Sequence, residues 1–424
     1  MYDKADNAAS DQPDVPGGCG PVPRVQPSEN RSLRQLVFEY VRATGRTARA
    51  DVARALFVSP GSVTAITSDL IAAGYLREVK GLVQGDTSRG RPRVALEVVP
   101  EGRYVIGVKL SDEHHSAVLS DFAGNTMARV TGPTPRARKS LDQMLDELGG
   151  IIETLLGQVN LDMANLAGVG VGLPGIVDHD TGIIPWSPLL TETDAPLKSA
   201  FEDRFQLPVQ IDNDTNVLTV AELWFGAGRV QTDFAVVTIE HGVGMGLVLD
   251  SKLFRGTRGM GLELGHIKVQ LGGALCRCGQ RGCLEAYLGD YALANEASTA
   301  AGQHIVSQKS PREMLTFLYN QAENGDEGAQ GIFHRAGRFL AIGLANIVQL
   351  FDPDLIILSG DRRRYEFLYT AFHKSEMQSM TLSSGRVPTR VEVKDSGDFV
   401  WATGASALAL SAATDLAFGG AWAA

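Results

Sequence analysis

Residues 276–285 read CRCGQRGCLE, and His266 stands ten positions before them. The glycines between the cysteines allow tight turns, so Cys276, Cys278 and Cys283 can approach one another. Three thiols and one imidazole complete a tetrahedral zinc shell and leave no open position, as in structural rather than hydrolytic zinc sites. A set of buried free cysteines is the alternative. We expect a structural zinc that joins His266 to the cysteine loop.

Two glutamates flank this motif. Glu263 begins the ELGH run that ends at His266, and Glu285 follows Cys283 by two positions. A zinc ion that joins His266 to Cys283 would also bring both glutamates towards one place. Carboxylates and an imidazole suit sugar hydroxyls, which both donate and accept hydrogen bonds. Taken alone, either glutamate is more simply a solvated surface charge.

A further polar group follows the strand-like run Val209–Asp212. It reads Asn213-Asp214-Thr-Asn216 and leads into a helical pattern. A carboxylate at the end of a strand can act as a general base towards a hydroxyl, which makes Asp214 a candidate. Asn and Asp equally suit a helix N-cap, which is the structural alternative.

The chain has 424 residues, 44% hydrophobic and 21% charged, which excludes a wholly disordered or collagen-like protein. About 150 residues per domain suggests two or three domains. No apolar run reaches roughly 18 residues, and the start of the chain lacks the basic and apolar stretches of a signal peptide. We expect a cytoplasmic protein with no membrane partner, where a cysteine cluster favours a metal over disulfides.

The net charge of −10 is unevenly distributed. Residues 30–95 carry eleven Lys/Arg against five Asp/Glu, a net charge of +6, whereas residues 1–29 carry −3. A basic segment on an acidic body suggests that one region faces a polyanion; charges that are merely solvated are the alternative. Residues 1–29 are rich in Pro, Gly and Asp, and we expect them to form a disordered tail.

Residues 30–98 have the pattern of a winged helix-turn-helix domain. Apolar spacing predicts two helices, Ser59-Pro60 is an N-cap followed by proline at the start of a third, and two strand-like runs joined by a turn-rich loop form the wing. A helical hairpin used for dimerisation is the alternative. The first two helices are predicted at 32–44 and 50–56, and the strands at 75–80 and 91–98.

In such a domain the third helix enters the major groove and the wing contacts the backbone or the minor groove. The third helix has no Arg, Asn or Gln, so bidentate readout of bases from it is poor. Specificity is then expected from the flanks, the wing or DNA shape. The candidate DNA contacts are Ser62, Thr64, Ala65, Thr67, Ser68, Arg89, Arg91 and Arg93.

Residues 103–424 alternate strand-like and helical patterns, which indicates an α/β fold. Two glycine-rich turns, GVGVGLPG at 168–175 and HGVGMG at 241–246, interrupt strands. Glycine at such points usually allows positive φ or the close approach of a ligand.

Together with the CxCGxxGCLE motif, these features resemble the ROK family (repressor, open reading frame, kinase) over about residues 31–410. The resemblance implies an actin-like, hexokinase-like (RNase H-like) body with two lobes and a sugar in the cleft. Regulators of the family add an N-terminal winged helix, as this chain does in its sequence pattern. The implied lobes are residues 103–217 plus 401–424, and residues 218–400 with the zinc-binding loop.

The resemblance also implies roles for single residues. Asn213 and Asp214 match the family's sugar-binding pair, and Asp214 matches the catalytic base of its kinases. Arg91 and Pro92 match the Gly-Arg-Pro wing of the regulators. The other sugar-contacting positions are Glu263, His266 and Glu285, and the zinc ligands are His266, Cys276, Cys278 and Cys283.

The phosphate-binding segments depart from those of the kinases. Kinases of the family carry DxGGTK, which cradles phosphate, whereas residues 108–114 read VKLSDEH and put Lys109 in place of the aspartate. Added side chains and acidic charge suit a phosphate cradle poorly, because it needs bare backbone N–H groups. The second phosphate turn begins with Glu240, which would repel a nucleotide phosphate. We therefore expect no enzyme activity and only a vestigial base at Asp214.

We interpret the chain as a sugar-responsive DNA-binding transcriptional regulator, a repressor of carbohydrate metabolism genes. It would bind double-stranded operator DNA as a homodimer or homotetramer, with a sugar or sugar derivative as effector. One alternative is a ROK sugar kinase, phosphorylating hexoses with ATP, that carries an appended DNA-binding domain; the retained Asp214 supports it. Another is a DNA-binding module whose body senses a partner protein, motivated by the unusual Leu189, Glu192 and Leu262 near the sugar-binding motifs.

Overall fold

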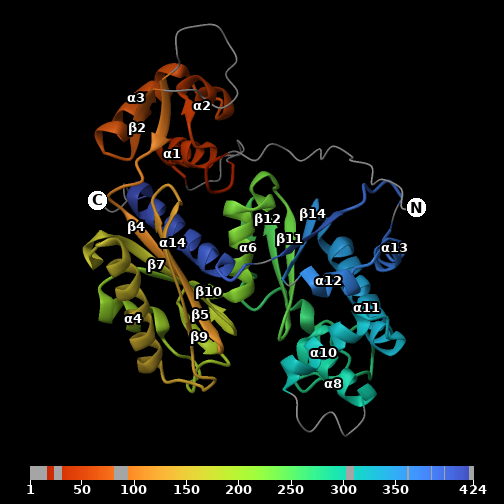
Figure 1. Ribbon diagram of the computed structural model, residues 1–424. Coiled ribbons are helices and arrows are strands. Elements are labelled where there is room, and N and C mark those ends of the chain that lie inside the picture. The colour runs from red at the N-terminus through yellow and green to blue at the C-terminus, as the bar shows by residue number, and fades with distance from the viewer. Residues whose placement is uncertain are drawn as a thin grey trace.

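The computed structural model describes residues 17–22, 31–80, 94–301, 310–360, 362–382, 384–395 and 397–419. A helical unit with a small sheet lies at one end of the molecule, beside a body that contains two five-stranded sheets (Figure 1). Helices α6 and α14 pack between the parts of this body. The mixed α/β class expected from the sequence is confirmed.

The N-terminal unit has three helices and a sheet of order β1-β3-β2. The hydroxyls of Ser32 and Ser59 cap α1 and α3 by accepting hydrogen bonds from backbone N–H groups. The helices and longer strands lie where apolar spacing predicted them, and β1 is too short to leave a periodic signal. The bounds are α1 Leu33–Thr44, β1 Thr47–Ala48, α2 Arg49–Ala55, α3 Pro60–Ala72, β2 Leu76–Lys80 and β3 Val94–Val98.

The first body sheet has the order β10-β7-β4-β5-β6, and β10, β7 and β4 are parallel. Parallel strands end at the same edge, and here the register pairs Lys109 with Gly172 and Leu173 with Asn213. Three segments far apart in the sequence therefore meet at one edge. The bounds are β4 Tyr104–Lys109, β5 His114–Asp121, β6 Thr126–Pro133, α4 Leu141–Val159, η1 Met163–Asn165, β7 Leu166–Leu173, β8 Ile176–Asp178, β9 Ile183–Trp186, α5 Leu197–Phe205 and β10 Val209–Asn213.

The second body sheet has the order β13-β12-β11-β14-β15, with β11, β14 and β15 parallel. Helices α8, α10 and α11 share a continuous apolar core with it. The bounds are α6 Asp214–Phe225, η2 Ala227–Val230, β11 Phe234–Ile239, β12 Val243–Leu249, β13 Lys252–Phe254, η3 Leu264–His266, α7 Glu285–Leu288, α8 Asp290–Ala301, α10 Pro311–Glu323, α11 Glu327–Phe351, β14 Leu355–Gly360, α12 Arg362–Leu368, α13 Ala371–Ser379, β15 Arg390–Asp395 and α14 Val400–Gly419.

Helix α14 packs on β4 and β7 of the first sheet and on α6. This approach requires glycine on both sides of the helix. A Cβ atom at Gly170 of β7 would overlap the backbone of α14, and one at Gly404 of α14 would overlap the backbone of α6. At its far end α14 reaches the N-terminal unit, where the Phe418 ring lies 4.9 Å from that of Phe38, centroid to centroid. One helix thus contacts the first sheet, α6 and α1.

Residues 17–22 lie between the N-terminal unit and the body, and we call them the N-terminal strap. The Cys19 N–H donates to the Arg42 carbonyl at 3.0 Å, and the next N–H donates to the Trp224 carbonyl at 2.8 Å. Cys19 is only 3% exposed. The disordered tail expected for residues 1–29 is therefore wrong for the strap, because backbone hydrogen bonds to α1 and α6 order a segment whose composition is polar and glycine-rich.

Two buried arginines stand beside the strap. Arg42 of α1 donates to Thr414 Oγ1 of α14 at 2.7 Å, and its guanidinium lies 4.7 Å from the centroid of the Trp224 ring in α6. Arg229 donates to the Gly20 carbonyl of the strap at 3.1 Å. Burial lowers the pKa of both guanidiniums, which nonetheless remain charged at neutral pH. A hydroxyl, a backbone carbonyl and the Trp224 ring therefore stabilise the two guanidinium groups where the N-terminal unit meets the body.

Among the described residues, no single helix is long and apolar enough to cross a membrane. The pair α2 and α3, bent by 120° with respect to each other, meets the length and composition criterion only when taken together.

We predict that Gly404→Ala lowers the free energy of unfolding by about 1–3 kcal/mol, because the added methyl group forces α14 away from α6. Urea denaturation, monitored by circular dichroism, measures the change in the free energy of unfolding. Gly157→Ala is the matched control: Gly157 is an exposed residue of α4 with no atom near the added methyl group, so it should gain up to about 1 kcal/mol. Equal stability of Gly404→Ala and the wild type would contradict the close packing.

Candidate functional site

His266, Cys276, Cys278 and Cys283 come together as their spacing predicted. Their ligand atoms, one per residue, all lie within 4.8 Å of one another. Cys276 Sγ is 3.7 Å from His266 Nδ1, and Cys278 Sγ is 3.7 Å from Cys283 Sγ. Zn–S bonds of about 2.3 Å in a tetrahedron separate two sulfurs by about 3.8 Å, so the spacing suits such an ion. All four cysteines of the chain are free thiols, and this cluster could hold a metal ion.

The surroundings of the cluster connect it to the second sheet. Lys268 forms a β-bridge with Cys283, and its Nζ lies 3.0 Å from the Cys283 sulfur. Glu285 Oε1 lies 3.7 Å from Cys276 Sγ. Its other oxygen accepts the N–H of Val243 at 3.4 Å. Glu285 therefore links the cysteine loop to the turn between β11 and β12.

Asn213 and Asp214 lie where β10 passes into α6. Asn213 is the N-cap of this helix: its Oδ1 accepts the Thr215 N–H at 2.8 Å, while its Nδ2 donates to the Gly175 carbonyl at 2.8 Å. The capping role considered from the sequence is thus real for Asn213. Burial raises the pKa of Asp214, and the ammonium of Lys109 opposes this shift. The Asp214 carboxylate and the end of β4 therefore lie close enough to interact.

The remaining predicted sugar contacts gather around the same place. Partial burial raises the pKa of Glu263; His266 opposes the shift, and the carboxylates of Glu285 and Asp214 reinforce it. His266, Glu285 and Asp214 therefore each act on the Glu263 carboxyl group. Leu262, directly before Glu263, has a left-handed backbone with φ of +65°. Such a conformation favours glycine, so Leu262, which the sequence marked as unusual, adopts a backbone that a branched side chain rarely takes.

Backbone N–H groups of the loop after β4 form hydrogen bonds to side chains of the same segment. The Ser111 N–H donates to His115 Nδ1 at 3.1 Å, and the N–H groups of Glu113 and His114 point to Ser111 Oγ at 3.2 and 3.3 Å. His115 is held in turn by Glu147, with 2.9 Å between Nε2 and Oε2. A phosphate cradle needs free N–H groups that point at the ligand. In this loop those donors already have partners.

Lys109 ends β4, and its Nζ lies 3.6 Å from the centroid of the Trp401 ring in α14. Its positive charge also acts on Glu240 in the turn between β11 and β12. Burial raises the pKa of Glu240, Lys109 opposes this shift, and Asp214 reinforces it. One ammonium and two carboxylates thus occupy the region between the two sheets where the resemblance places phosphate chemistry.

Four of the five DNA contacts predicted on α3 lie on its exposed face. Thr67 is the exception: it is fully buried, and its hydroxyl accepts from Arg49 Nε at 2.8 Å and donates to the Thr64 carbonyl at 3.2 Å. It shares the inward helical face with Val63 and Leu70, so we withdraw it as a DNA contact. Ser62, Thr64, Ala65 and Ser68 are exposed. Arg89, Arg91 and Arg93 lie outside the described residues.

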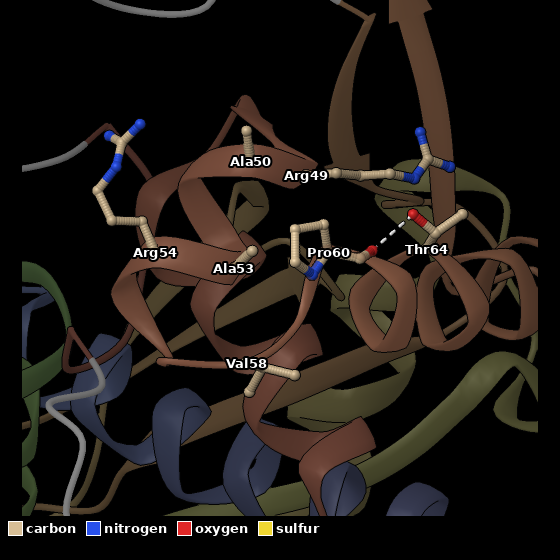
Figure 2. Close-up of a pocket in the computed structure, with 7 residues that line it drawn as sticks. All are labelled: Arg49, Ala50, Ala53, Arg54, Val58, Pro60 and Thr64. Carbon is tan, nitrogen blue, oxygen red and sulfur yellow. Dashed lines mark hydrogen bonds between the residues drawn. The ribbon is translucent and has the colours of Figure 1, made fainter.

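Sequence reasoning overlooked two arginines of α2. Arg49 and Arg54 line a pocket of about 520 Å³ between α2 and α3, and Figure 2 shows their side chains on opposite sides of it. The apolar spacing of α2 gave no reason to select them. An arginine directly before the helix predicted at 50–56, itself followed by a candidate recognition helix, was the available signal.

The body has two five-stranded sheets, a His/Cys cluster and a group of carboxyl side chains near the end of β10. These are the features of a ROK-type body. The ROK family profile matches residues 105–412, and the chain belongs to this family. The expected resemblance is therefore confirmed.

Curated relatives extend the match beyond that body. The "putative xylose repressor" of Caldicellulosiruptor sp. (strain Rt8B.4) is 28% identical over 330 residues, 77% of this chain and 82% of the relative. The "DNA-binding transcriptional dual regulator NagC" of Escherichia coli K12 is 29% identical over 353 residues, 82% of this chain and 84% of the relative. The similarity to xylose and N-acetylglucosamine repressors thus spans most of the chain.

Solved structures agree. A "ROK family transcriptional regulator, homolog of E. coli MLC protein" superposes with a TM-score of 0.75 at 25% identity, over 90% of this chain and 96% of that one. A ROK family glucokinase from Streptomyces griseus, in complex with glucose and AMPPNP, gives a TM-score of 0.59 at 26% identity, but over only 72% of this chain. The regulator matches more of this chain than the kinase does.

We predict that His115→Gln reduces the pH dependence of stability. Burial lowers the pKa of His115 from its ordinary 6.5, so the unfolded chain takes up a proton that the folded chain resists. Stability is therefore present above pH 6.5 and is lost as the pH falls below it, by at most about 1.4 kcal/mol per pH unit for one group. Gln keeps an acceptor for the Ser111 N–H but does not titrate.

Urea denaturation at pH 7.0, 6.0 and 5.5 measures this effect. His114→Gln is the control, because the neighbouring His114 side chain is exposed. The same slope in the wild type and in His115→Gln would rule out this role for His115.

Proposed function

We propose that the protein is a sugar-responsive, DNA-binding transcriptional regulator, a repressor of carbohydrate metabolism genes. The observation that carries this proposal is the course of α6. The helix begins at Asp214 among the candidate sugar contacts and ends beside Trp224, whose ring lies against Arg42 of α1. A change at the sugar site thereby has a direct mechanical route to the N-terminal unit. The names of the relatives, repressors and a transcriptional regulator, support the same function.

In this proposal residues 30–98 form a winged helix-turn-helix that binds double-stranded operator DNA. The capped α3 with its exposed hydroxyls and the net positive charge of the segment support this role. The protein would act in the cytoplasm as a homodimer or homotetramer, because helix-turn-helix proteins commonly bind paired half-sites. Asn213, Asp214, Glu263, His266 and Glu285 would bind the sugar or sugar derivative.

A ligand shifts a conformational equilibrium only by its differential affinity for the two states. A 100-fold preference for the state with weak DNA affinity corresponds to about 2.7 kcal/mol, enough to release an operator at modest sugar excess. Both α6 and α14 run from the sugar site to α1, so relative movement of the two sheets would turn the N-terminal unit. In this mechanism the buried arginines and the strap transmit the movement.

We assign the His266, Cys276, Cys278 and Cys283 cluster to a structural zinc. Four protein ligands leave no position for water or substrate, so the ion would supply rigidity and no hydrolytic chemistry. It would hold His266 and the start of α7 in place, and with them Glu285.

In this proposal the chain is not a sugar kinase. The occupied N–H groups of Ser111, Glu113 and His114 support this view, because they are not free for a phosphate. The ammonium of Lys109 would repel a metal ion, and the carboxylate of Glu240 would repel a phosphate. The retained Asp214 favours the kinase alternative. A coupled ATPase assay over a panel of hexoses separates the two, and turnover that Asp214→Asn abolishes would overturn the regulator.

Fluorescence anisotropy of the full chain on DNA from upstream of its own gene, at fixed salt, tests the proposed function. We expect binding that exceeds binding to scrambled DNA and that one member of a panel of monosaccharides and phosphosugars weakens. Selection from a random duplex library covers the case of a distant operator. A protein that selects no sequence in either format is not a sequence-specific regulator.

We predict that Cys278→Ser loses both bound zinc and the sugar response. The metal content of the purified full chain, measured by mass spectrometry, should be about one zinc per chain in the wild type and should fall well below that in the variant. Cys19→Ser is the control for zinc content, because this thiol lies outside the cluster. Loss of zinc with a normal sugar response would contradict the role given to the ion.

We predict that Trp224→Leu uncouples sugar from DNA. A buried cation–π contact contributes about 0.5–2 kcal/mol, so the sugar-induced fall in DNA affinity should shrink by about 2- to 30-fold while sugar affinity is retained. Anisotropy with and without sugar, and calorimetry for the sugar, measure the two quantities. Phe372→Leu, at a half-exposed aromatic of α13, should leave both unchanged. An undiminished response in Trp224→Leu would exclude this route.

A further inference from the structure

On the exposed face of α3, the hydroxyls of Thr64 and Ser68 offer acceptors rather than donors. The Thr64 hydroxyl donates to the Pro60 carbonyl at 2.8 Å, and the Ser68 hydroxyl donates to the Thr64 carbonyl at 2.9 Å. A hydroxyl has one proton, so the outward side of each of these oxygens can only accept. The helix contains no Arg, Asn or Gln. A guanine edge in the major groove presents only the acceptors N7 and O6, and these α3 hydroxyls have no proton left for it.

Arg49 brings a donor to this face from the neighbouring helix. It is the first residue of α2, and its Nε donates to Thr67 Oγ1 of α3 at 2.8 Å. Its Nη1 pairs with Glu78 Oε1 of β2 at 2.8 Å. Because Thr67 is buried and itself bonded to the helix backbone, it fixes the guanidinium beside α3. The Arg49 side chain nevertheless remains 25% exposed.

The guanidinium stands at the rim of the pocket between α2 and α3. Figure 2 shows Arg49 beside Thr64, with Ala50, Ala53 and Pro60 along the pocket. Arg54 occupies the opposite side, where its side chain is 77% exposed and pairs with Asp51 of its own helix at 3.2 Å. One rim arginine is therefore fixed against α3 and the other is free to follow a phosphate.

We propose that Arg49 is the base-reading residue of this protein and that it recognises one guanine per half-site through the N7 and O6 atoms in the major groove. This inference rests on the proposed DNA-binding function and adds the residue and the base. Planar guanidinium donors match the two guanine acceptors, whereas an ammonium makes a single point contact. Arg54 contributes a phosphate contact that carries no sequence information.

Glu78 is the partner that Arg49 exchanges for guanine. Its side chain is 50% exposed, and ion pairs in such positions are weak. In the free protein Glu78 holds the Arg49 guanidinium in place and neutralises its charge. On DNA the Nη groups turn to the base while Thr67 keeps Nε. Binding to guanine therefore includes the loss of this ion pair.

The test uses the full chain and a random duplex library. Wild type, Arg49→Lys and Arg54→Lys are each taken through selection, and the enriched guanines are then replaced one at a time by 7-deazaguanine, which lacks N7. Lysine preserves the positive charge at both positions, so a purely electrostatic contact survives the change. Thermal melts confirm that each variant is folded.

For the wild type we expect a fixed guanine in each half-site, whose 7-deaza form binds about 5- to 150-fold more weakly. Arg49→Lys should lose this guanine preference and bind the 7-deaza DNA as well as normal DNA. Arg54→Lys should keep the preference. Retention of the guanine preference by Arg49→Lys overturns the inference, as does equal weakening on all sequences. A wild type that selects no sequence overturns the proposed function as well.

Glu78→Gln provides a second test in which Arg49 and Thr67 are both left unsubstituted. It should tighten binding to the selected DNA, because Arg49 no longer has a charged partner to leave. The gain should disappear when the key guanine is replaced by 7-deazaguanine. An equal gain on both DNAs would show that Glu78 acts only by repelling phosphates, and would count against its exchange with guanine.

Discussion

The structure depends on how closely α14 approaches its neighbours. Gly170 lets the helix lie against the first sheet, and Gly404 lets it lie against α6, with backbone meeting backbone on both sides. An interior without spare volume transmits displacement instead of absorbing it. From this central position α14 reaches Lys109 through Trp401 and reaches α1 through Phe418. The contact between the N-terminal unit and the body is thus continuous with the packing around the candidate sugar site.

At that site, charged groups lie where the family resemblance places phosphate chemistry. Lys109 and Glu240 occupy the region between the sheets, and His115 takes up the Ser111 N–H after β4. The His/Cys cluster stands on the other side and holds Glu285 next to Cys276. The result is a group of hydrogen-bonding side chains at one end of α6. The only buried cations at the other end of that helix, within the described residues, are Arg42 and Arg229, which face carbonyls, a hydroxyl and rings.

The sequence predicted features that depend on local pattern. The cluster of His266 with three cysteines, the capped α3, the α/β body and the family all followed from spacing and motif. The prediction that Thr67 contacts DNA was wrong because a small polar residue fits either face of a helix. Only packing against α2 shows that this residue is buried. The prediction of disorder was wrong for the strap because backbone hydrogen bonds to distant helices order it, and composition does not reveal such bonds. Arg49 was overlooked because its role arises from a contact with α3.

The loop that follows β4 also limits how this body can change over evolutionary time. Restoring an aspartate at position 109 would remove the ammonium that lies against Trp401, yet the Ser111 N–H would still be bonded to His115 and Glu113 would still contact Arg312 of α10 at 3.0 Å. A return to phosphate binding needs several substitutions together, and each alone breaks an existing contact without creating a cradle. The loop therefore restricts the evolutionary paths open to this body: a single substitution there disturbs present contacts, and only several together could form a phosphate cradle.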